Sequence, residues 1–171
     1  LQRGQTSYTA NKGMVELRER IADHVTRYGL EYDPGEEIIV TAGASEAIDA
    51  TFRALVNPGD SVAIAQPAYV SYEPGVRFAG GEPLPVETRA EDEFVLTRER
   101  LEAAGAQDAE LLVYCYPNNP TGATMTEDEL REVAAFCREH DIAVMADEIY
   151  AALTYEGDHT SIATLPGMRE R

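Results

Sequence analysis

Two short segments of the sequence place a carboxylate and an amide where a ligand could use them. Asp147 directly follows the apolar run 144–146, so its carboxylate is expected to be half buried at the end of a strand. A half-buried charge needs a partner, and no basic residue stands beside it in the sequence, so we expect a partner distant in the sequence or a ligand. Asn119 lies in the loop 117–122, whose two prolines stiffen it and can direct the amide to a ligand oxygen. The same loop also fits a tight turn closed by an Asx hydrogen bond.

Two further segments add an anion cradle and an aromatic ring. The segment 42–47 consists mainly of small residues that lead into a predicted helix. The free amides of a helix N-terminus, together with the Ser45 hydroxyl, suit a phosphate. Ser45 also fits the plainer role of a helix N-cap. Tyr69 follows another predicted strand, where a tyrosine is either a stacking platform or an ordinary core or rim residue.

The hydrophobic pattern predicts alternating helices and strands that would position these segments. Leu17, Ile21 and Val25 recur at helical spacing, which predicts an amphipathic helix over 16–28 that Gly29 ends. Strands are expected over 38–40, 61–65, 82–87, 111–115 and 142–146. Helices are expected over 45–55, 69–78, 97–104 and 126–140, the last with a capping box at 126–129. Loop structure is expected over 155–171. This alternation predicts one α/β domain of three layers, a mostly parallel sheet with helices on both faces. Ligands of such sheets lie beyond the carboxyl ends of the strands, so the four segments should meet.

The charge balance excludes some classes of function. The chain has 31 acidic and 14 basic residues, a formal net charge of −17. This charge excludes a basic groove for nucleic acid and opposes docking on an anionic membrane, and no apolar run approaches the roughly 20 residues of a membrane-spanning helix. Acid excess with a single lysine, Lys12, indicates adaptation to a salt-rich cytoplasm. The alternative is a coding bias toward arginine in an ordinary acidic protein.

The cysteines and histidines indicate no metal site. Cys115 lies in an apolar run and Cys137 in a predicted helix, which favours buried free thiols over a disulfide framework or a zinc site. His24, His140 and His159 are scattered, and we expect none of them to be catalytic. His140 is expected near the end of a helix, where a partly positive ring suits the helix dipole.

Taken in order along the chain, these segments resemble the fold-type-I pyridoxal-phosphate enzymes, and specifically the class I aminotransferases of the aspartate/aromatic type. The resemblance is carried by Tyr8–Gly13 with Glu16–Arg18, Thr41–Ala47, Pro117–Gly122 and Asp147–Tyr150. It covers nearly all of the 171 residues, and the last two motifs together are highly specific.

The resemblance implies a pyridoxal 5′-phosphate site shared within a homodimer. Ala44 and Ser45 would hold the cofactor phosphate. Tyr69 would stack on the pyridine ring. Tyr8 would reach across the dimer interface to the phosphate in the partner subunit.

The resemblance also implies which residues support the chemistry. Asp147 would pair with the protonated ring nitrogen and so keep the ring able to accept electrons. Asn119 would hydrogen-bond the ring's 3-oxygen and contact the substrate carboxylate. Tyr150 would bind the same 3-oxygen.

One departure from the family pattern concerns lysine. These enzymes form a Schiff base between the cofactor and a lysine about thirty residues beyond the Asp-Glu-Ile-Tyr motif. No lysine follows Asp147 here, and Lys12 is expected to be a surface residue. We therefore expect residues 1–171 to be a piece of a longer protein: a partial cofactor-binding large domain, inactive by itself, with the small domain largely absent and the Schiff-base lysine beyond Arg171.

The function that the resemblance implies for the complete protein is transfer of an amino group between an L-amino acid and a 2-oxo acid, in a cytoplasmic biosynthetic process. A β-lyase or a decarboxylase on the same scaffold is an alternative. A second alternative is an aminotransferase-like sensor domain of a transcription regulator. The sequence does not identify the amino acid.

Overall fold

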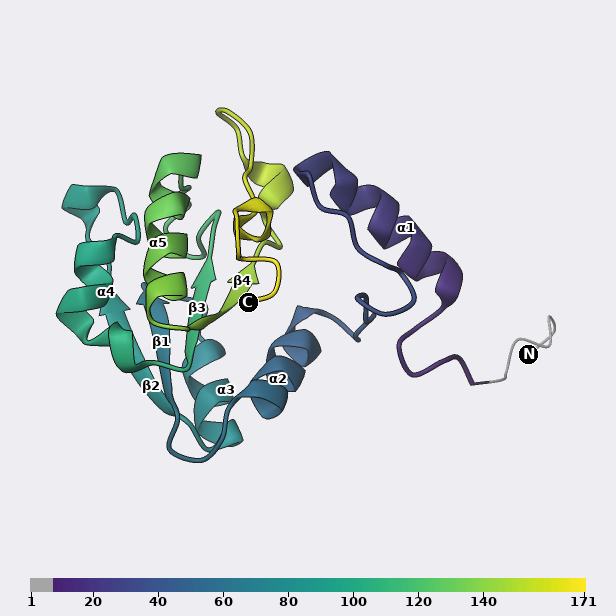
Figure 1. Ribbon diagram of the computed structural model, residues 1–171, viewed down its shortest axis with the longest axis horizontal. Helices are drawn as coiled ribbons and strands as arrows, with labels where there is room; N and C mark the ends of the chain where they lie inside the picture. The colour runs from purple at the N-terminus through teal and green to yellow at the C-terminus, as the bar shows by residue number, and fades with distance from the viewer. Residues whose placement is uncertain (1–7) are drawn as a thin grey trace.

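The protein forms a parallel sheet flanked by helices, in a computed structural model that describes residues 8–171 (Figure 1). The helices are α1 (Val15–Val25), α2 (Ala44–Leu55), α3 (Tyr72–Ala79), α4 (Arg98–Ala104) and α5 (Glu127–Glu139), and the strands are β1 (Ser61–Gln66), β2 (Glu82–Glu87), β3 (Leu111–Cys115) and β4 (Ala143–Asp147). Short 3-10 turns occupy Thr26–Tyr28, Ala90–Asp92, Ala106–Asp108, Ala151–Leu153 and Ile162–Thr164.

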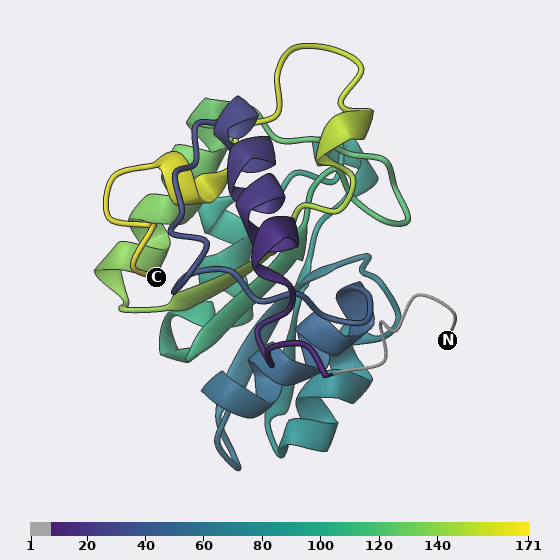
Figure 2. The same ribbon diagram turned by 90° about the vertical axis from the view of Figure 1, so that its right-hand side faces the viewer.

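The central strands β1 and β3 are buried on both faces because helices cover both faces of the sheet. Successive side chains of a strand point to opposite sides of the sheet. Ala63 of β1 and Tyr114 of β3 join an apolar cluster with α4 and α5, whereas Ile64 and Cys115 join a second cluster with α2 and α3. Figures 1 and 2 show the same separation of the helices into two layers. The predicted three-layer α/β architecture is confirmed.

The order of the strands is β2-β1-β3-β4, and all adjacent pairs are parallel. The chain moves from β1 to β2 on one side and then crosses back to place β3 on the other side of β1. The order therefore reverses between β1 and β3. Open α/β sheets bind their ligands at such a reversal, outside the carboxyl ends of the strands.

Most predicted elements occur with small shifts at their ends. The capping box is present: Thr126 accepts a hydrogen bond from the Glu129 amide, and the Glu129 side chain accepts one from the Thr126 amide. The helix predicted over 69–78 begins three residues later, at Tyr72, because 69–71 form a turn. The predicted strand over 61–65 extends to Gln66, and that over 142–146 is shifted by one residue.

The strand predicted over 38–40 is wrong. The segment has no regular secondary structure and joins no strand in the described part of the chain. Of its amides, only that of Val40 donates to another backbone group, the Lys12 carbonyl at 3.0 Å. Ile38 is buried, whereas Ile39 is 67% exposed. An apolar run indicates burial on at least one side, but a strand needs a neighbouring strand, which the run itself does not specify.

The helix α1 lies outside the layers of the sheet (Figures 1 and 2). The turn Thr26–Tyr28 extends it, and Gly29 ends that turn with a positive φ of 75°, as predicted. Its apolar stripe is only partly covered, and Leu17 is 44% exposed. The amphipathic pattern is therefore present without a complete partner surface among residues 8–171.

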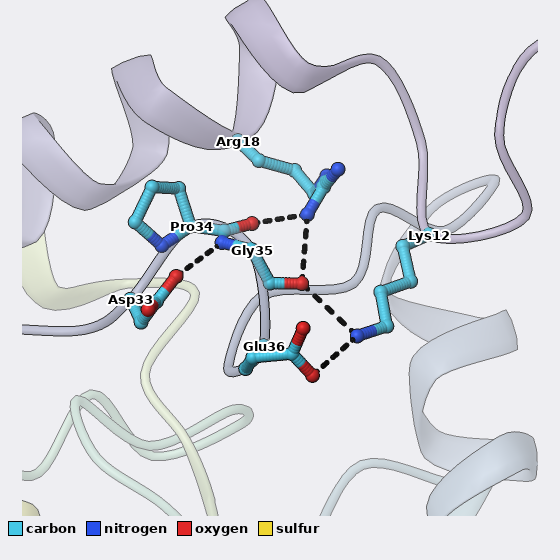
Figure 3. A network of polar contacts seen from close by, with 6 residues as sticks. All are labelled: Lys12, Arg18, Asp33, Pro34, Gly35 and Glu36. Carbon is cyan, nitrogen blue, oxygen red and sulfur yellow. Dashed lines mark hydrogen bonds and ion pairs between the residues drawn. The ribbon is translucent and has the colours of Figure 1, made fainter.

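Polar contacts attach this N-terminal region to the turn 33–36 (Figure 3). The guanidinium of Arg18 is buried and donates to the carbonyls of Gly13, Pro34 and Gly35. Lys12 donates to the Gly35 carbonyl at 3.0 Å and forms an ion pair with Glu36 at 3.1 Å. Lys12 thus lies at the surface, as expected, and helps to hold this turn.

The remaining part of the chain, 155–171, consists of turns around one short 3-10 helix, close to the loop structure predicted. The Arg171 carbonyl accepts a hydrogen bond from Val144 of β4 at 2.9 Å. Among the described residues, no helix is both long enough and apolar enough to cross a membrane.

The cysteines and His140 occupy the predicted environments. Cys115 and Cys137 are buried free thiols. Burial raises the pKa of Cys137 to about 12 and also raises the pKa of Cys115. His140 is the C-terminal cap of α5.

Candidate functional site

A cavity of about 200 Å³ lies at the carboxyl ends of β1, β3 and β4, where the strand order reverses. Its lining includes Ala44, Ser45, Tyr69, Tyr72, Cys115, Asn119, Asp147 and Tyr150. The structure therefore brings together all of the predicted site residues except Tyr8. They come from four segments that are far apart in the sequence, which supports the expectation that these segments meet.

Asp147 is the last residue of β4, and its carboxylate is partly buried at the cavity. One carboxylate oxygen, Oδ2, accepts a hydrogen bond from the Tyr72 hydroxyl at 2.7 Å, and Oδ1 accepts one from the Ile149 amide at 3.1 Å. No ion pair in the described part of the chain involves Asp147. A carboxylate in this setting favours a cationic group in the cavity.

Tyr72 is a site residue that sequence reasoning missed. Its ring is buried in the first turn of α3 and reaches across to Asp147, 75 residues away in the sequence. Burial, and next the hydrogen bond to Asp147, raise the pKa of Tyr72 far above its usual value, so the hydroxyl stays protonated and donates. The only signal was its place on the apolar face of a predicted helix, which is typical of core residues.

The N-terminus of α2 forms one wall of the cavity. Gly43 is the N-cap, with a φ of 96°, and its conformation suits glycine. The interpretation of Ser45 as the N-cap is therefore wrong: Ser45 lies inside the first turn and its side chain is exposed at the cavity. The first amides of the helix and this hydroxyl provide hydrogen-bond donors at the positive end of the helix dipole.

Tyr69 lies between this helix end and Tyr72. The two tyrosine rings pack edge to face with centroids 5.6 Å apart. The neighbouring hydroxyls of Ser71, first, and Ser45 lower the pKa of Tyr69. The Tyr69 ring is therefore part of the cavity wall, and it also packs, half buried, against the apolar cluster of α2 and α3.

The loop after β3 uses its two asparagines differently. The Asn118 side chain is buried and makes the turn, because its Oδ1 accepts from the Thr121 amide at 3.0 Å and its amide donates to the Pro67 carbonyl at 3.2 Å. The predicted Asx turn therefore belongs to Asn118. Among the hydrogen bonds of residues 8–171, none involves the Asn119 side chain, which faces the cavity.

Tyr8 and Tyr150, the first and last of the predicted site residues along the chain, differ in their position relative to the cavity. Tyr150 lines the cavity and also an adjoining cavity of about 510 Å³ that contains Asn119, Tyr155 and Glu156. Tyr8 does not line either cavity, and its side chain is fully exposed. Tyr8 therefore contributes nothing to the site of its own chain.

The side chains present fit a flat, phosphorylated, cationic ring. The helix end with Ser45 can bind a phosphate, Tyr69 can cover a ring face, and Asp147 can pair with a protonated ring nitrogen. Pyridoxal 5′-phosphate combines these features. The carboxylate without a cation is the observation that most favours this fit.

Comparisons with known proteins support this interpretation. The family model "Aminotransferase class I and II" matches residues 1–170. A putative aminotransferase, YugH, from Bacillus subtilis is 48% identical over the whole chain and 45% of its own length. Aromatic-amino-acid aminotransferase 2 from Thermococcus litoralis is 39% identical over the whole chain and 44% of its own length.

A solved structure extends the similarity to three dimensions. The aromatic aminotransferase from Pyrococcus horikoshii has a TM-score of 0.93 and 42% identity, over 98% of this chain and 45% of that protein. The chain thus spans less than half the length of the relatives that it matches. Pyridoxal 5′-phosphate is the cofactor of class I enzymes of this family. The chain belongs to the aminotransferase class I and II family.

Proposed function

We propose that the complete protein is a pyridoxal-phosphate-dependent aminotransferase that moves an amino group between an L-amino acid and a 2-oxo acid. The family and the names of the relatives support this function. In this proposal, residues 1–171 are part of the cofactor-binding large domain. The Schiff-base lysine and most of the small domain belong to the remainder of the protein.

The observation that carries the proposal is the position of Asp147. When bound, pyridoxal 5′-phosphate acts as an electron sink for the bonds of the amino acid's α-carbon. Asp147, held by Tyr72 and the Ile149 amide, would keep a proton on the ring nitrogen. Its orientation is set before any ligand binds, because both carboxylate oxygens already accept hydrogen bonds.

The other residues would bind and orient. The first-turn amides at Ala44 and Ser45, with the Ser45 hydroxyl, would hold the phosphate. Tyr69 would cover one face of the ring. Asn119 and Tyr150 would donate to the ring's 3-oxygen, and the Asn119 amide would also contact the substrate carboxylate.

We also propose a homodimer, with Tyr8 contributing to the partner subunit's phosphate site. Tyr8 is exposed, and so are four apolar side chains on α1 or in the chain close to it, which supports an interface there: Met14, Val15, Leu17 and Ile39.

We further propose a cytoplasmic, biosynthetic enzyme adapted to high salt. Two buried unpaired thiols suit a reducing compartment, and the charge of −17 suits a salt-rich one.

The experiment that tests the reaction is a product assay on the complete protein. With an amino acid and 2-oxoglutarate, we expect glutamate and the corresponding 2-oxo acid in equal amounts. Release of ammonia with pyruvate would instead show a β-lyase, and release of carbon dioxide a decarboxylase. Cofactor binding without any of these products would favour a sensor domain and contradict the proposal.

A further inference from the structure

A further cavity, of about 360 Å³, lies on the α5 side of the sheet, away from the 200 Å³ cavity at Asp147. Its walls are Tyr114 of β3, the N-terminal part of α5, Glu148, and the segment 154–160. Glu156 of that segment lines both this cavity and the adjoining 510 Å³ cavity that contains Asn119, and Tyr155 lines the second of these cavities. The segment therefore lies between the two cavities. The position of the segment therefore shapes the wall beside Asn119.

The segment has few attachments of its own. In the described structure, no backbone hydrogen bond involves residues 155–160. Tyr155 and its neighbours up to Asp158 are exposed. By contrast, Ser161 and Ile162, which follow the segment, are buried. A stretch with so few contacts depends on the side chains that do hold it.

His159 makes the one ion pair and the one aromatic contact of this segment in the described part of the chain. Its ring is only 9% exposed, and its Nε2 lies 3.6 Å from Glu148 Oε2. The ring of Tyr28 packs edge to face on it, with centroids 5.4 Å apart. His159 is therefore placed between β4 and the turn that follows α1.

The electrostatic surroundings favour this pairing. The cavity is lined by four acidic residues, Glu127, Glu148, Glu156 and Asp158, and His159 is the only basic side chain in its lining. Glu148 also contributes to raising the pKa of the buried Tyr114, after burial itself. His159 Nε2 and the Tyr114 hydroxyl are buried without a hydrogen-bond partner among residues 8–171. Glu148 Oε2, at 3.6 Å, is thus the acidic oxygen paired with His159 Nε2, beyond hydrogen-bond distance but within reach of an ion pair.

We propose that His159, paired with Glu148, is a positioning residue that fixes the segment 154–160 and thereby sets the wall of the cavity beside Asn119. Glu148 is well placed for this role because it directly follows Asp147 at the end of β4. The effect on substrate rests on the proposed function, since it assumes that the amino acid binds beside Asn119. The effect on the segment itself does not.

The test uses the complete protein and the variants His159→Gln, Glu148→Gln and the double variant. Limited chymotrypsin cleavage after the exposed Tyr155 should become about tenfold faster in each single variant, with no further increase in the double variant, because both substitutions remove the same interaction. The matched control is His24→Gln, at an exposed histidine whose ring also packs on Tyr28, and it should leave cleavage after Tyr155 unchanged.

Steady-state kinetics add a second readout. We expect the single variants to raise KM for the amino donor about threefold to tenfold while kcat changes less than about twofold. An unchanged rate of cleavage after Tyr155 in both single variants, or additive effects in the double variant, would overturn the proposal. Glu148→Gln keeps the shape of the side chain, so it provides the test if His159→Gln does not fold. If the wild-type protein transfers no amino groups, the proposed function fails, while the cleavage result still decides the role of His159.

Discussion

At the scale of single residues, the contact between Tyr72 and Asp147 sets the orientation of the carboxylate. A hydrogen bond to a charged group is worth roughly 1.5–3 kcal/mol, so its loss should be measurable. We expect Tyr72→Phe to lower kcat of the complete protein about tenfold, because Asp147 loses one of its two donors. The control is Tyr116→Phe, which removes a buried hydroxyl bonded to the Phe94 carbonyl on the other side of the sheet. Equal losses in the two variants would contradict a specific role for Tyr72.

A second prediction at this scale concerns Cys137. Burial raises its pKa to about 12, so the neutral thiol persists well above neutral pH and the reactive thiolate is scarce. We expect iodoacetamide at about pH 8 to leave Cys137 unmodified in the native protein and to modify it after unfolding. Mass spectrometry of the alkylated peptides measures this. Rapid labelling of Cys137 in the native protein would show that the thiol is not buried.

The role of a side chain could be predicted from the sequence where its place in a strand or helix already determines where it lies. Asp147 follows an apolar strand, so its position at the sheet edge followed from the pattern. The sequence does not show which of the two adjacent asparagines makes the turn, or whether Ser45 or Gly43 caps α2. Both outcomes depend on the local φ and ψ angles, which the residue type constrains only weakly. The Tyr72 contact joins residues 75 positions apart, and no local pattern reports such a pair.

At the scale of elements, the close approach of two segments fixes the N-terminal loop against the chain that leads into α2. Gly13 has a φ of 94°, and a Cβ built there would lie 2.6 Å from the Cβ of Val40. We expect Gly13→Ala to lower the free energy of unfolding by about 1–3 kcal/mol, from backbone strain and the clash together.

Gly105→Ala is the matched control for this substitution. Its φ is also positive, 77°, but nothing lies within 4 Å of the added Cβ, so only the strain remains. Denaturant unfolding of the complete protein should therefore show a larger loss for Gly13→Ala. Equal losses would show that the contact with Val40 adds nothing.

The elements themselves were largely predictable. Strands β1, β3 and β4 are apolar runs bounded by turn residues, whereas β2 contains two prolines between two glutamates. Helices α4 and α5 begin at the side-chain caps Thr97 and Thr126, the second with Glu129 in a capping box. The segment 38–40 is the exception: it has the composition of a strand, but no strand lies beside it among the described residues. Pairing is a property of two segments, so a single run does not determine it.

At the scale of the whole molecule, the net charge of −17 opposes the compact state through self-repulsion. Salt screens that repulsion. We expect the Tm of the complete protein to rise as KCl is increased from about 0.01 to about 1 M, over which the screening length falls about tenfold. Thermal unfolding followed by circular dichroism measures it. A Tm that stays constant or falls would contradict the proposed adaptation to salt.

Asp147, which would support the cofactor, is the residue on which the proposed function depends most. The most direct measurement compares cofactor affinity and turnover of the complete wild-type protein with those of Asp147→Ala and of the surface control Asp49→Ala, which removes only an exposed pair with Arg53. We predict that Asp147→Ala weakens pyridoxal 5′-phosphate binding and lowers kcat at saturating cofactor by about 1,000-fold or more, whereas Asp49→Ala matches the wild type. An Asp147→Ala protein that binds the cofactor and turns over like the wild type would contradict the account.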